Sequence, residues 1–475
     1  MRLSRRSLLS AALIGVASPR PGGTPGPGAA DWRALADGLE GTLDLPGSVS
    51  YEQARRLFSP RFDHILPPAI VHCASPADVV EAVRFAVRTG LPIVPRGGGH
   101  SYVGASTTTG GLVLDVRPMK GVGYDAPTST ATIGGGTSLL DVYTGLGAYN
   151  VSIPSGTCGS VGISGLTSGG GIGGAASAYG LTCDGVVAAD VVTADGRYRT
   201  VDAAREPELF WALRGGGGGQ FGVVTSWRIR THPAGNTGTF QLTFGWTDAA
   251  AVATGWQNRI AVAPDNSWSS CQFTADRVGA LSVRVAGFVL DSDAAAEVTA
   301  MTTAIGRSPV TTVIESKPHV QILRERAAGA ARATHLIGSE IFRQSLPPAG
   351  ITALLGVVQA RAASRRPGLA KLKRMTGAPA RVAADATAFP WHGAASMLQW
   401  LVEPPVADAA SIADGYTWID SGHRAVAPWS AGRYVNYLEP GPTDPVRYHG
   451  AHLERLRRVR AAADPSRVFR SACPI

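Results

Sequence analysis

The sequence is poor in three features that mark common protein classes: paired cysteines, long apolar segments and clustered basic residues. Its five cysteines lie far apart with no CxxC pair, so they form neither a disulfide framework nor the ligand spacing of a zinc site. They are Cys73, Cys158, Cys183, Cys271 and Cys473. Because their number is odd, we expect one thiol without a partner, namely Cys158, and pairing among the other four stays open. No segment after the N-terminal region is apolar for long enough to cross a bilayer.

The net charge of +9 comes without a basic block interleaved with aromatic residues, which is the pattern of nucleic-acid-binding proteins. The densest basic stretch, residues 455–460, is typical of the solvated face of a helix. No strand–GxGxxG–helix unit with a downstream acid is found, which disfavours a Rossmann nicotinamide enzyme. We therefore expect no nucleic-acid partner and no metal ion.

Residues 1–30 have the composition of a targeting signal. Arg5 and Arg6 precede an apolar run over residues 8–17, and small residues and prolines follow. This order predicts a twin-arginine-type signal peptide, which exports proteins already folded, with cleavage near residues 28–30. An ordinary general-secretory signal is the alternative. With either signal we expect an exported protein, periplasmic or extracellular, without membrane contact once the signal is removed.

Glycine is abundant, with 59 residues, and two of its clusters each carry one reactive side chain. The first is RGGGHSY at residues 96–102, which contains His100. The second is PSGTCGSVGISGLTSGGGIGG at residues 154–174, which contains Cys158. Glycine lets a backbone turn sharply and approach an anion closely. An imidazole and a thiol in two such loops predict a cofactor held at two points.

A chain of 475 residues is too long for one simple core, so we expect two domains, and the texture of the sequence changes near Pro233. Before it, glycine clusters alternate with short elements, and Asp195-Gly196 predicts a hairpin turn. After it, the strands are typical of a mainly antiparallel sheet. Apolar periodicity predicts helices over residues 76–89, 138–146, 207–213, 297–305, 351–362 and 451–463. It predicts strands over residues 91–94, 112–116, 223–229, 240–246 and 281–290.

Four motifs together resemble the berberine-bridge-enzyme-like branch of the vanillyl-alcohol-oxidase family of flavoproteins. Two are the glycine clusters above, and a third is LFWALRGGGGGQFGVVTSW at residues 209–227. The fourth is the tail, with GRYVNYLEP at residues 432–440 and DPSRVFR at residues 464–470. Their order and spacing cover nearly the whole mature chain, which is identified as a secreted bacterial FAD-linked oxidase of this kind.

The resemblance implies an α+β chain with the two-domain PCMH-type FAD-binding fold. Residues 31–235 would form the FAD-binding domain and residues 236–428 a substrate domain built on an antiparallel sheet. Residues 429–475 would return to the FAD-binding domain as a C-terminal segment.

The resemblance also implies FAD held by two covalent bonds. His100 matches the position that bonds the flavin 8α-methyl carbon, and Cys158 matches the position that bonds flavin C6. Both bonds need an unprotonated nucleophile, so both sites should depress the pKa of these groups. Taken alone, each residue has a plainer interpretation, as a surface-loop histidine and a buried thiol. The other cofactor-binding positions implied are Arg96, Gly97, Gly98, Gly99, Ser101, Val161, Gly162, Gly165, Gly169, Gly170, Gly222, Val223, Val224 and Asn436.

For catalysis the resemblance implies a tyrosine base. Tyr434 matches the family's catalytic tyrosine, which takes the hydroxyl proton as hydride leaves the same carbon for flavin N5. Tyr102 matches a second tyrosine of the site. A free tyrosine has a pKa of about 10, so the Tyr434 phenolate needs hydrogen bonds from Tyr102 or a cation that the sequence does not identify. The alternative for each is a tyrosine that only packs on the isoalloxazine ring.

Oxygen is the expected electron acceptor, with hydrogen peroxide as co-product. Val161 matches the family's gate on the oxygen side of the flavin, where a small residue resembles the oxygen-reactive members. A dehydrogenase that does not use oxygen is the alternative.

Oligosaccharides are the expected substrates, bound near Trp391 and Gln399 on a strand that faces the flavin. Trp391 departs from relatives that have histidine there, which weakens transfer of a specific substrate. Thr167-Ser168 departs from a common Leu-Gly, a difference that bears on the local backbone contacts of the glycine loop. Tryptophans of the second domain can stack on sugars, or they pack in the core. These are Trp246, Trp256, Trp268, Trp391 and Trp400. A tailoring oxidase of secondary metabolites and a binding protein without turnover are the other interpretations, and the oligomeric state stays open.

Overall fold

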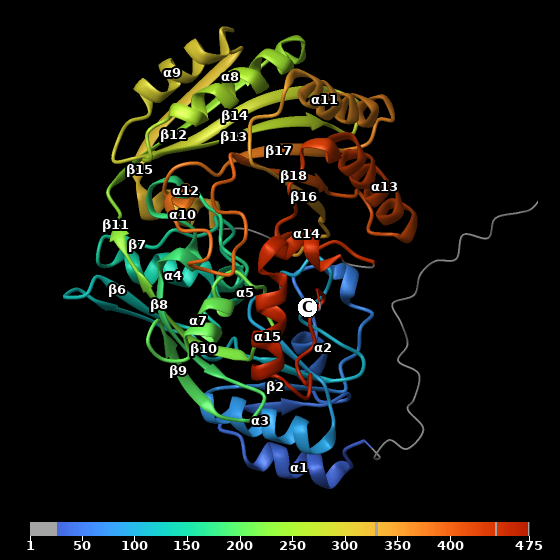
Figure 1. The fold of residues 1–475 in the computed structure, drawn as a ribbon. Helices are drawn as coiled ribbons and strands as arrows, with labels where there is room; N and C mark the ends of the chain where they lie inside the picture. Colours follow the sequence, from blue (N-terminus) through green and yellow to red (C-terminus); the bar gives the residue numbers. More distant parts are fainter. Residues whose placement is uncertain (1–25, 328–330, 442–443, 474) are drawn as a thin grey trace, which may run out of the picture.

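The structure is a computed structural model that describes residues 26–327, 331–441, 444–473 and 475. Most of the expected signal segment therefore lies outside the described residues, and Ala29, in the expected cleavage region, is the first residue of helix α1 (Ala29–Asp37). Helices and mainly antiparallel sheets share the chain, so the expected α+β class is confirmed (Figure 1). Within the described ranges, no helix is long and apolar enough to span a membrane.

The N-terminal part builds a four-stranded sheet in the order β1-β2-β4-β3. Its strands are β1 (Thr42–Asp44), β2 (Ala69–His72), β3 (Ile93–Arg96) and β4 (Leu112–Asp115), and the short helix α2 (Tyr51–Ala54) precedes β2. Helix α3 (Pro76–Thr89) packs its apolar face on this sheet. Ser75 caps the first turn of α3, and Gly90 ends the helix in a left-handed conformation, as the sequence predicts. Strand β3 then runs directly into the first glycine cluster.

A five-stranded antiparallel sheet follows, in the order β5-β6-β10-β8-β9. Its strands are β5 (Val122–Asp125), β6 (Thr130–Gly134), β8 (Val186–Val192), β9 (Tyr198–Asp202) and β10 (Val223–Arg230). The expected turn at Asp195-Gly196 joins β8 to β9, with Gly196 at a positive φ of 68°. The helices between these strands are α4 (Leu139–Gly147), α5 (Ile163–Ser168), α6 (Ala176–Tyr179) and α7 (Pro207–Leu213). Trp211, Phe221 and Trp227 belong to the buried cluster that holds this part together.

The change of texture near Pro233 coincides with the short strand β11 (His232–Pro233), which pairs with β7 (Val151–Ser152). After it comes an antiparallel seven-stranded sheet in the order β15-β12-β14-β13-β17-β18-β16. Its strands are β12 (Asn236–Phe244), β13 (Ser267–Ala275), β14 (Leu281–Leu290), β15 (Thr311–Pro318), β16 (Leu336–Phe342), β17 (Gly368–Arg374) and β18 (Ser396–Val402).

Helices cover one face of this large sheet (Figure 1). They are α8 (Ala249–Val262), α9 (Ala295–Ile305), α11 (Pro348–Ala363) and α13 (Ala409–Val426). Alternate residues of the strands, such as Leu242, Cys271 and Trp400, face these helices and form the core. The other residues of the same strands therefore point away from the helices, toward the N-terminal part. Helices α10 (His319–Ala327) and α12 (Ala378–Arg381) lie outside this covering layer.

The C-terminal segment returns to the N-terminal part, as Figure 1 shows for α14 (Pro445–His449) and α15 (Leu453–Ala463). Leu456 and Val459 of α15 join the buried cluster around Trp227. A parallel bridge joins Phe469 to Ile93 of β3. An antiparallel bridge joins Gly432 to strand β16 of the large sheet. The tail is therefore bonded to both sheet systems.

Some local expectations are wrong. The strand expected to reach Trp246 ends at Phe244, and Trp246 opens a 3-10 turn. Arg460, expected on a solvated helix face, is buried and donates to the backbone carbonyl of Phe469. All five cysteines are unpaired, so no disulfide cross-links these sheets.

Candidate active site

A cavity of about 660 Å³ is lined by residues from both glycine clusters, from strand β17 and from the C-terminal segment. Its volume falls within the range of small-molecule sites. A third glycine-rich segment, residues 217–222, completes the wall. Elements distant in the sequence therefore meet at this one place.

The two glycine clusters touch backbone to backbone because neither carries a side chain at the contact. A Cβ added to Gly98 would lie 2.2 Å from the backbone nitrogen of Gly162, a distance that only movement of the backbone could relieve. Glycine at these two positions therefore lets the His100 loop and the Cys158 loop pack together. The two reactive side chains come to line the same cavity.

Other glycines leave room on the cavity wall. At Gly97, Gly165 and Gly218, an added Cβ would meet no atom closer than 3.9 Å. All three line the cavity, so a side chain there would take space from a bound molecule. The wall fits a large flat cofactor that lies against the backbone.

His100 is held in a desolvated position. Its ring stacks on Phe58 at a centroid distance of 4.0 Å, and burial lowers the pKa of His100 to about 4. The imidazole is thus neutral at neutral pH, as a nitrogen nucleophile must be. Cys158 is half-buried, with its Sγ 3.7 Å from Ser160 Oγ.

Arg96, in contrast, fastens the first loop to the sheet beneath it. Its side chain is 1% exposed, lies 3.6 Å from Asp115 and donates to the backbone carbonyls of Ala54 and Ser106. A buried arginine needs such partners, because an unpaired buried charge is costly. Arg96 thereby fixes the end of β3 from which the His100 loop departs.

Tyr434 is buried in the C-terminal segment and hydrogen-bonded on all sides. Its hydroxyl oxygen accepts from the Gly171 backbone N–H at 2.9 Å and from Asn436 Nδ2 at 3.0 Å. Its own backbone N–H donates to Ser339 Oγ at 3.0 Å. Burial raises the pKa of Tyr434, although both donors oppose that shift. The expected hydrogen bond from Tyr102 to Tyr434 is not formed; Gly171 and Asn436 take its place.

Tyr437, which the sequence analysis did not single out, lies between the two expected tyrosines. Its ring meets Tyr434 edge-on at 5.1 Å and Tyr102 edge-on at 5.7 Å. Lys373 Nζ on β17 lies 2.8 Å from the Tyr437 hydroxyl oxygen, and 5.0 Å from the ring centroid. Burial lowers the pKa of Lys373 to about 7 and raises that of Tyr437. The amine nearest the tyrosines is therefore that of Lys373, and it bonds Tyr437 rather than Tyr434, so it is not the cation expected beside Tyr434.

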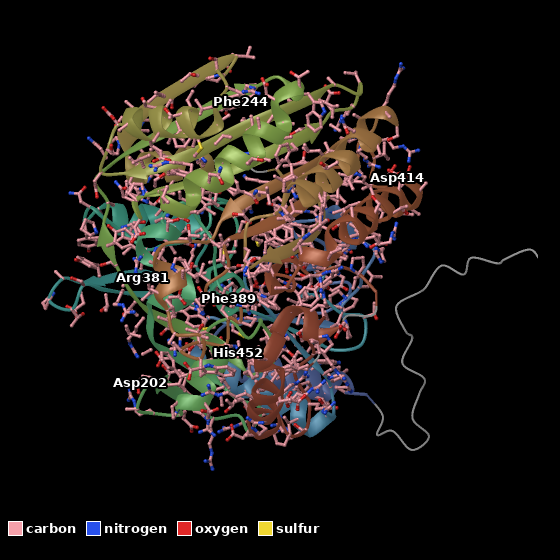
Figure 2. The ribbon with its side chains drawn as sticks, turned by 45° about the horizontal axis from the view of Figure 1, so that its top comes forward. Asp202, Phe244, Arg381, Phe389, Asp414 and His452 are labelled. Atoms are coloured by element: carbon pink, nitrogen blue, oxygen red, sulfur yellow. The ribbon has the colours of Figure 1, made fainter. Side chains whose placement is uncertain are left out.

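Most of the expected site residues line the cavity. Those that do are Arg96, Gly97, Gly98, Gly99, His100, Ser101, Tyr102, Cys158, Val161, Gly162, Gly165, Gly222, Val223, Val224, Tyr434 and Asn436. Gly169 and Gly170 lie behind this wall: a Cβ on Gly169 would clash with the Asn436 side chain, and one on Gly170 would touch Phe389. Phe389, labelled in Figure 2, also packs edge-on against Tyr434.

The expected substrate residues lie away from the cavity wall. Trp391 is 4% exposed, and its indole N–H donates to the backbone carbonyl of Arg433, so it anchors the tail instead of facing the cavity. Gln399 lies on β18, where it pairs with Lys371 of β17, and it is not on the cavity wall. Trp256 and Trp400 are fully buried core residues, and Trp246 packs against the same core. The structure favours the core interpretation of these tryptophans.

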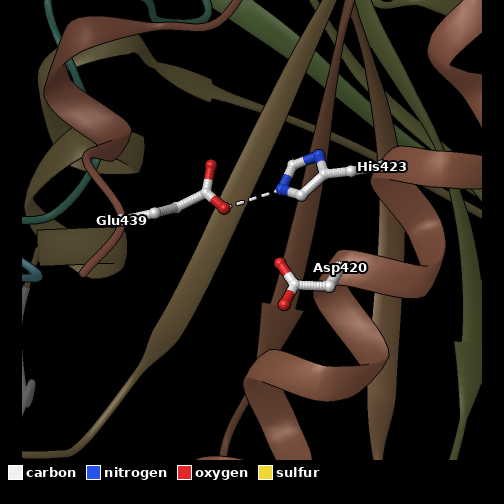
Figure 3. Close-up of side chains that lie close together, drawn as sticks. All are labelled: Asp420, His423 and Glu439. Carbon is white, nitrogen blue, oxygen red and sulfur yellow. Dashed lines mark hydrogen bonds and ion pairs between the residues drawn. The ribbon is translucent and has the colours of Figure 1, made fainter. Parts of the chain in front are cut away.

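A buried ion-pair network supports the segment that carries the tyrosines. His423 of α13 lies between two carboxylates, 2.5 Å from Glu340 and 2.7 Å from Glu439, the latter contact marked in Figure 3. Arg433 pairs with Glu439 and Arg447 with Glu340. Both carboxylates raise the pKa of His423 against the opposing effect of burial. Asp420 lies close enough to share a cation with His423 and Glu439, but both histidine nitrogens are already hydrogen-bonded.

Comparison with known proteins gives this architecture its class. Residues 67–202 match the family model "FAD binding domain", and residues 433–475 match "Berberine and berberine like". An uncharacterized FAD-linked oxidoreductase of Bacillus subtilis, YgaK, is 30% identical over 91% of this chain and 96% of its own length. The chain is therefore an FAD-linked oxidoreductase.

Within that class, the structure resembles Physcomitrella patens BBE-like 1 with a TM-score of 0.83 and 25% identity, over 93% of this chain and 98% of the other. The carbohydrate oxidase of Microdochium nivale is 34% identical over 45% of this chain and 44% of its own length. The chain belongs to the berberine-bridge-enzyme-like family, and the resemblance seen in its motifs is confirmed.

Proposed function

We propose that this FAD-linked oxidoreductase is an oxidase that carries its flavin on two covalent bonds and oxidises an alcohol or hemiacetal carbon of a sugar. One observation carries the proposal: His100, Cys158, Tyr102, Asn436 and Tyr437 line a single cavity. The bound FAD supplies hydride acceptance and the transfer of electrons to O2, with hydrogen peroxide as co-product. The handling of protons falls to side chains of the chain itself.

His100 and Cys158 are the proposed attachment points. The lowered pKa of His100 supports this role, because only a neutral imidazole can bond a flavin carbon. Cys158 is half-buried on the cavity wall, where a thiolate can reach a bound ring. Two bonds secure a cofactor without walls on every side, which leaves the cavity open to large substrates.

Tyr437 is the proposed acceptor of the substrate hydroxyl proton, in preference to Tyr434. Both tyrosines have a raised pKa, so neither is a phenolate on its own at neutral pH. Tyr437 has Lys373 within 2.8 Å, whereas the Tyr434 hydroxyl oxygen has only the neutral donors of Gly171 and Asn436. Of the two tyrosine hydroxyl groups, only that of Tyr437 therefore has a neighbouring side chain, Lys373, that can accept its proton.

The proposed proton path has two transfers. The substrate hydroxyl gives its proton to Tyr437 Oη, and Tyr437 gives its own proton to the neutral amine of Lys373. Since the pKa of Lys373 is about 7, much of this lysine is neutral at neutral pH and can accept the proton. No isolated phenolate forms in the low-dielectric interior, where it would be costly.

Two features support the choice of sugar and oxygen. The similarity to the carbohydrate oxidase of Microdochium nivale supports a sugar as substrate. Val161 is a small residue on the cavity wall beside Cys158, which suits access of O2 to the flavin. We also propose domain limits at residues 31–235, 236–428 and 429–475, and an export signal over residues 1–30.

The test combines two measurements on the purified protein. Acid precipitation should leave the yellow flavin with the protein pellet, and a panel of mono- and disaccharides should give peroxide in air and bleach the flavin without air. A flavin that washes into the supernatant overturns the covalent attachment. Bleaching by sugars without peroxide in air would make the enzyme a dehydrogenase, and bleaching by phenolic alcohols alone would replace the substrate class.

A further inference from the structure

A row of polar side chains crosses the large sheet on the face opposite its helices. The register pairs Arg284 of β14 with Gln272 of β13, Gln272 with Lys371 of β17, and Lys371 with Gln399 of β18. Gln399 in turn pairs with Ser339 of β16. Directly paired residues lie on the same face of a sheet and about 5 Å apart, so these five form one continuous row.

This row lies beside the active-site cavity: none of its five residues is on the cavity wall, but the row borders Lys373 and the tail, which are. Ser339, at one end, accepts the backbone N–H of Tyr434. Lys373 is two residues from Lys371 on the same strand, so both point to the same face, and Lys373 lines the cavity beside Tyr437. The row therefore lies next to the part of the cavity that holds Lys373 and Tyr437, two residues further along strand β17.

The row is positive and has no acid of its own. Among the described residues, Lys371 makes no ion pair or hydrogen bond, and Arg284 bonds only the neutral oxygens of Gln241 and Gln272. Arg326 of α10 lies near enough to interact electrostatically with Lys371, and its guanidinium covers the ring of Phe288. Glu315, the acid whose charge acts on Arg326, is itself paired with Lys317.

The positive charges in and beside the row repel one another. Burial, Lys373, Arg284 and Arg326 together lower the pKa of Lys371 to about 7. Gln399 is 8% exposed, and its amide is hydrogen-bonded to no described residue. A group of like charges without a counterion costs free energy. An anion bound between Lys371 and Gln399 would remove this cost and accept a hydrogen bond from the Gln399 amide.

We infer that Lys371, Arg284 and Gln399 form a subsite for a carboxylate, so that the substrate of the proposed oxidase is a sugar with an acidic group next to the oxidised unit. The Lys371 ammonium and the Gln399 amide donate to the carboxylate oxygens, and Arg284 adds a second positive charge across the row. This inference rests on the proposed function for its sugar, but not for its anion.

The test compares cellobiose with cellobiouronic acid, the same disaccharide with a carboxylate at C6 of its non-reducing unit. In the wild-type holoenzyme, we expect kcat/KM for peroxide formation to favour the acid by about 10- to 100-fold at low salt, the range of a charge-assisted hydrogen bond. High salt should reduce this preference. Lys371→Met and Arg284→Gln should each reduce it toward unity with little change for cellobiose, whereas Lys120→Met, at an exposed site elsewhere, should leave it intact.

Calorimetric titration of the same holoenzymes with cellobiouronic acid separates this inference from the proposed function. Binding that weakens in Lys371→Met but not in Lys120→Met supports the carboxylate subsite, even if no sugar is oxidised. Equal affinity and equal kcat/KM for the acid and the neutral sugar in the wild type overturn it, even if both are oxidised. Lys371→Met removes an unpaired charge and should fold at least as well as the wild type, which the retained covalent flavin checks.

Discussion

Lys373 Nζ lies 2.8 Å from the hydroxyl oxygen of Tyr437, inside the cavity that also contains His100 and Cys158. Burial lowers the pKa of the lysine to about 7 and raises that of the tyrosine. When Lys373 is the neutral amine, the Tyr437 hydroxyl and the Lys373 amine carry no charge, and together they can take up one proton. This property gives the site a proton acceptor near neutral pH.

The first prediction concerns pH. If neutral Lys373 accepts the proton, the rate of anaerobic flavin reduction rises as pH increases through about 7, because deprotonation creates the acceptor, and then levels off. Lys373→Met should abolish this rise and slow reduction by about 10²-fold. Stopped-flow bleaching over a pH series measures both effects, with Lys120→Met as the control. A pH profile unchanged in Lys373→Met would remove the lysine from the proton path.

The second prediction separates the two tyrosines of the tail. Tyr437→Phe should slow anaerobic bleaching by about 10²-fold or more, whereas reoxidation in air stays near the wild-type rate. Tyr434→Phe should act mainly on stability, because the N–H of Gly171 and the amide of Asn436 lose their acceptor, at a cost of about 1–3 kcal/mol. The reverse pattern would assign the base to Tyr434.

The third prediction concerns the covalent flavin. His100→Ala alone and Cys158→Ala alone should each keep the flavin attached through the remaining bond, and the double variant should release it. Absorbance of the pellet and the supernatant after acid precipitation measures the attached fraction. Complete release from either single variant would mean that the two attachments do not form independently.

The fourth prediction concerns oxygen. Val161 lies on the cavity wall, and Val161→Leu should narrow the approach and slow reoxidation of the reduced flavin in air. Val161→Ala is the matched control and should leave reoxidation at least as fast as in the wild type. Anaerobic reduction should be similar in all three proteins. If leucine leaves reoxidation unchanged, oxygen reaches the flavin by another path.

The fifth prediction concerns the His423 network. Its carboxylate partners raise the pKa of His423 above the ordinary value of 6.5. The folded protein therefore gains stability from this histidine below about 6.5, and loses that gain as pH rises through the folded pKa. His423→Gln should lower the free energy of unfolding by about 3 kcal/mol at acidic pH and remove this pH dependence.

Thermal unfolding over a pH series measures this effect, with His64→Gln, at an exposed histidine, as the control. Equal pH dependence in the wild type and His423→Gln would show that the network does not depend on the histidine charge. Loss of the network should also lower activity, because Glu439 and Arg433 belong to the tail that carries Tyr434 and Tyr437.

Sequence alone determined those features whose signals are local. Ser75, Pro76 and Gly90 limit helix α3 within the chain itself, and Asp195-Gly196 specifies its own turn. The two glycine clusters were predictable as one site because each carries its reactive side chain with it. The family followed from the same motifs, since their order in the chain needs no tertiary information.

Only the tertiary structure decided which residues act together across the sheet. Lys373 and Tyr437 are 64 positions apart, and they meet because β17 pairs with β18 and the tail returns along β16. Lysine on an alternating strand is indistinguishable from a solvated residue until the opposite face of the sheet is known. The tryptophans show the converse: large aromatic residues suit both a sugar platform and a core, and packing against the helices placed Trp256 and Trp400 in the core.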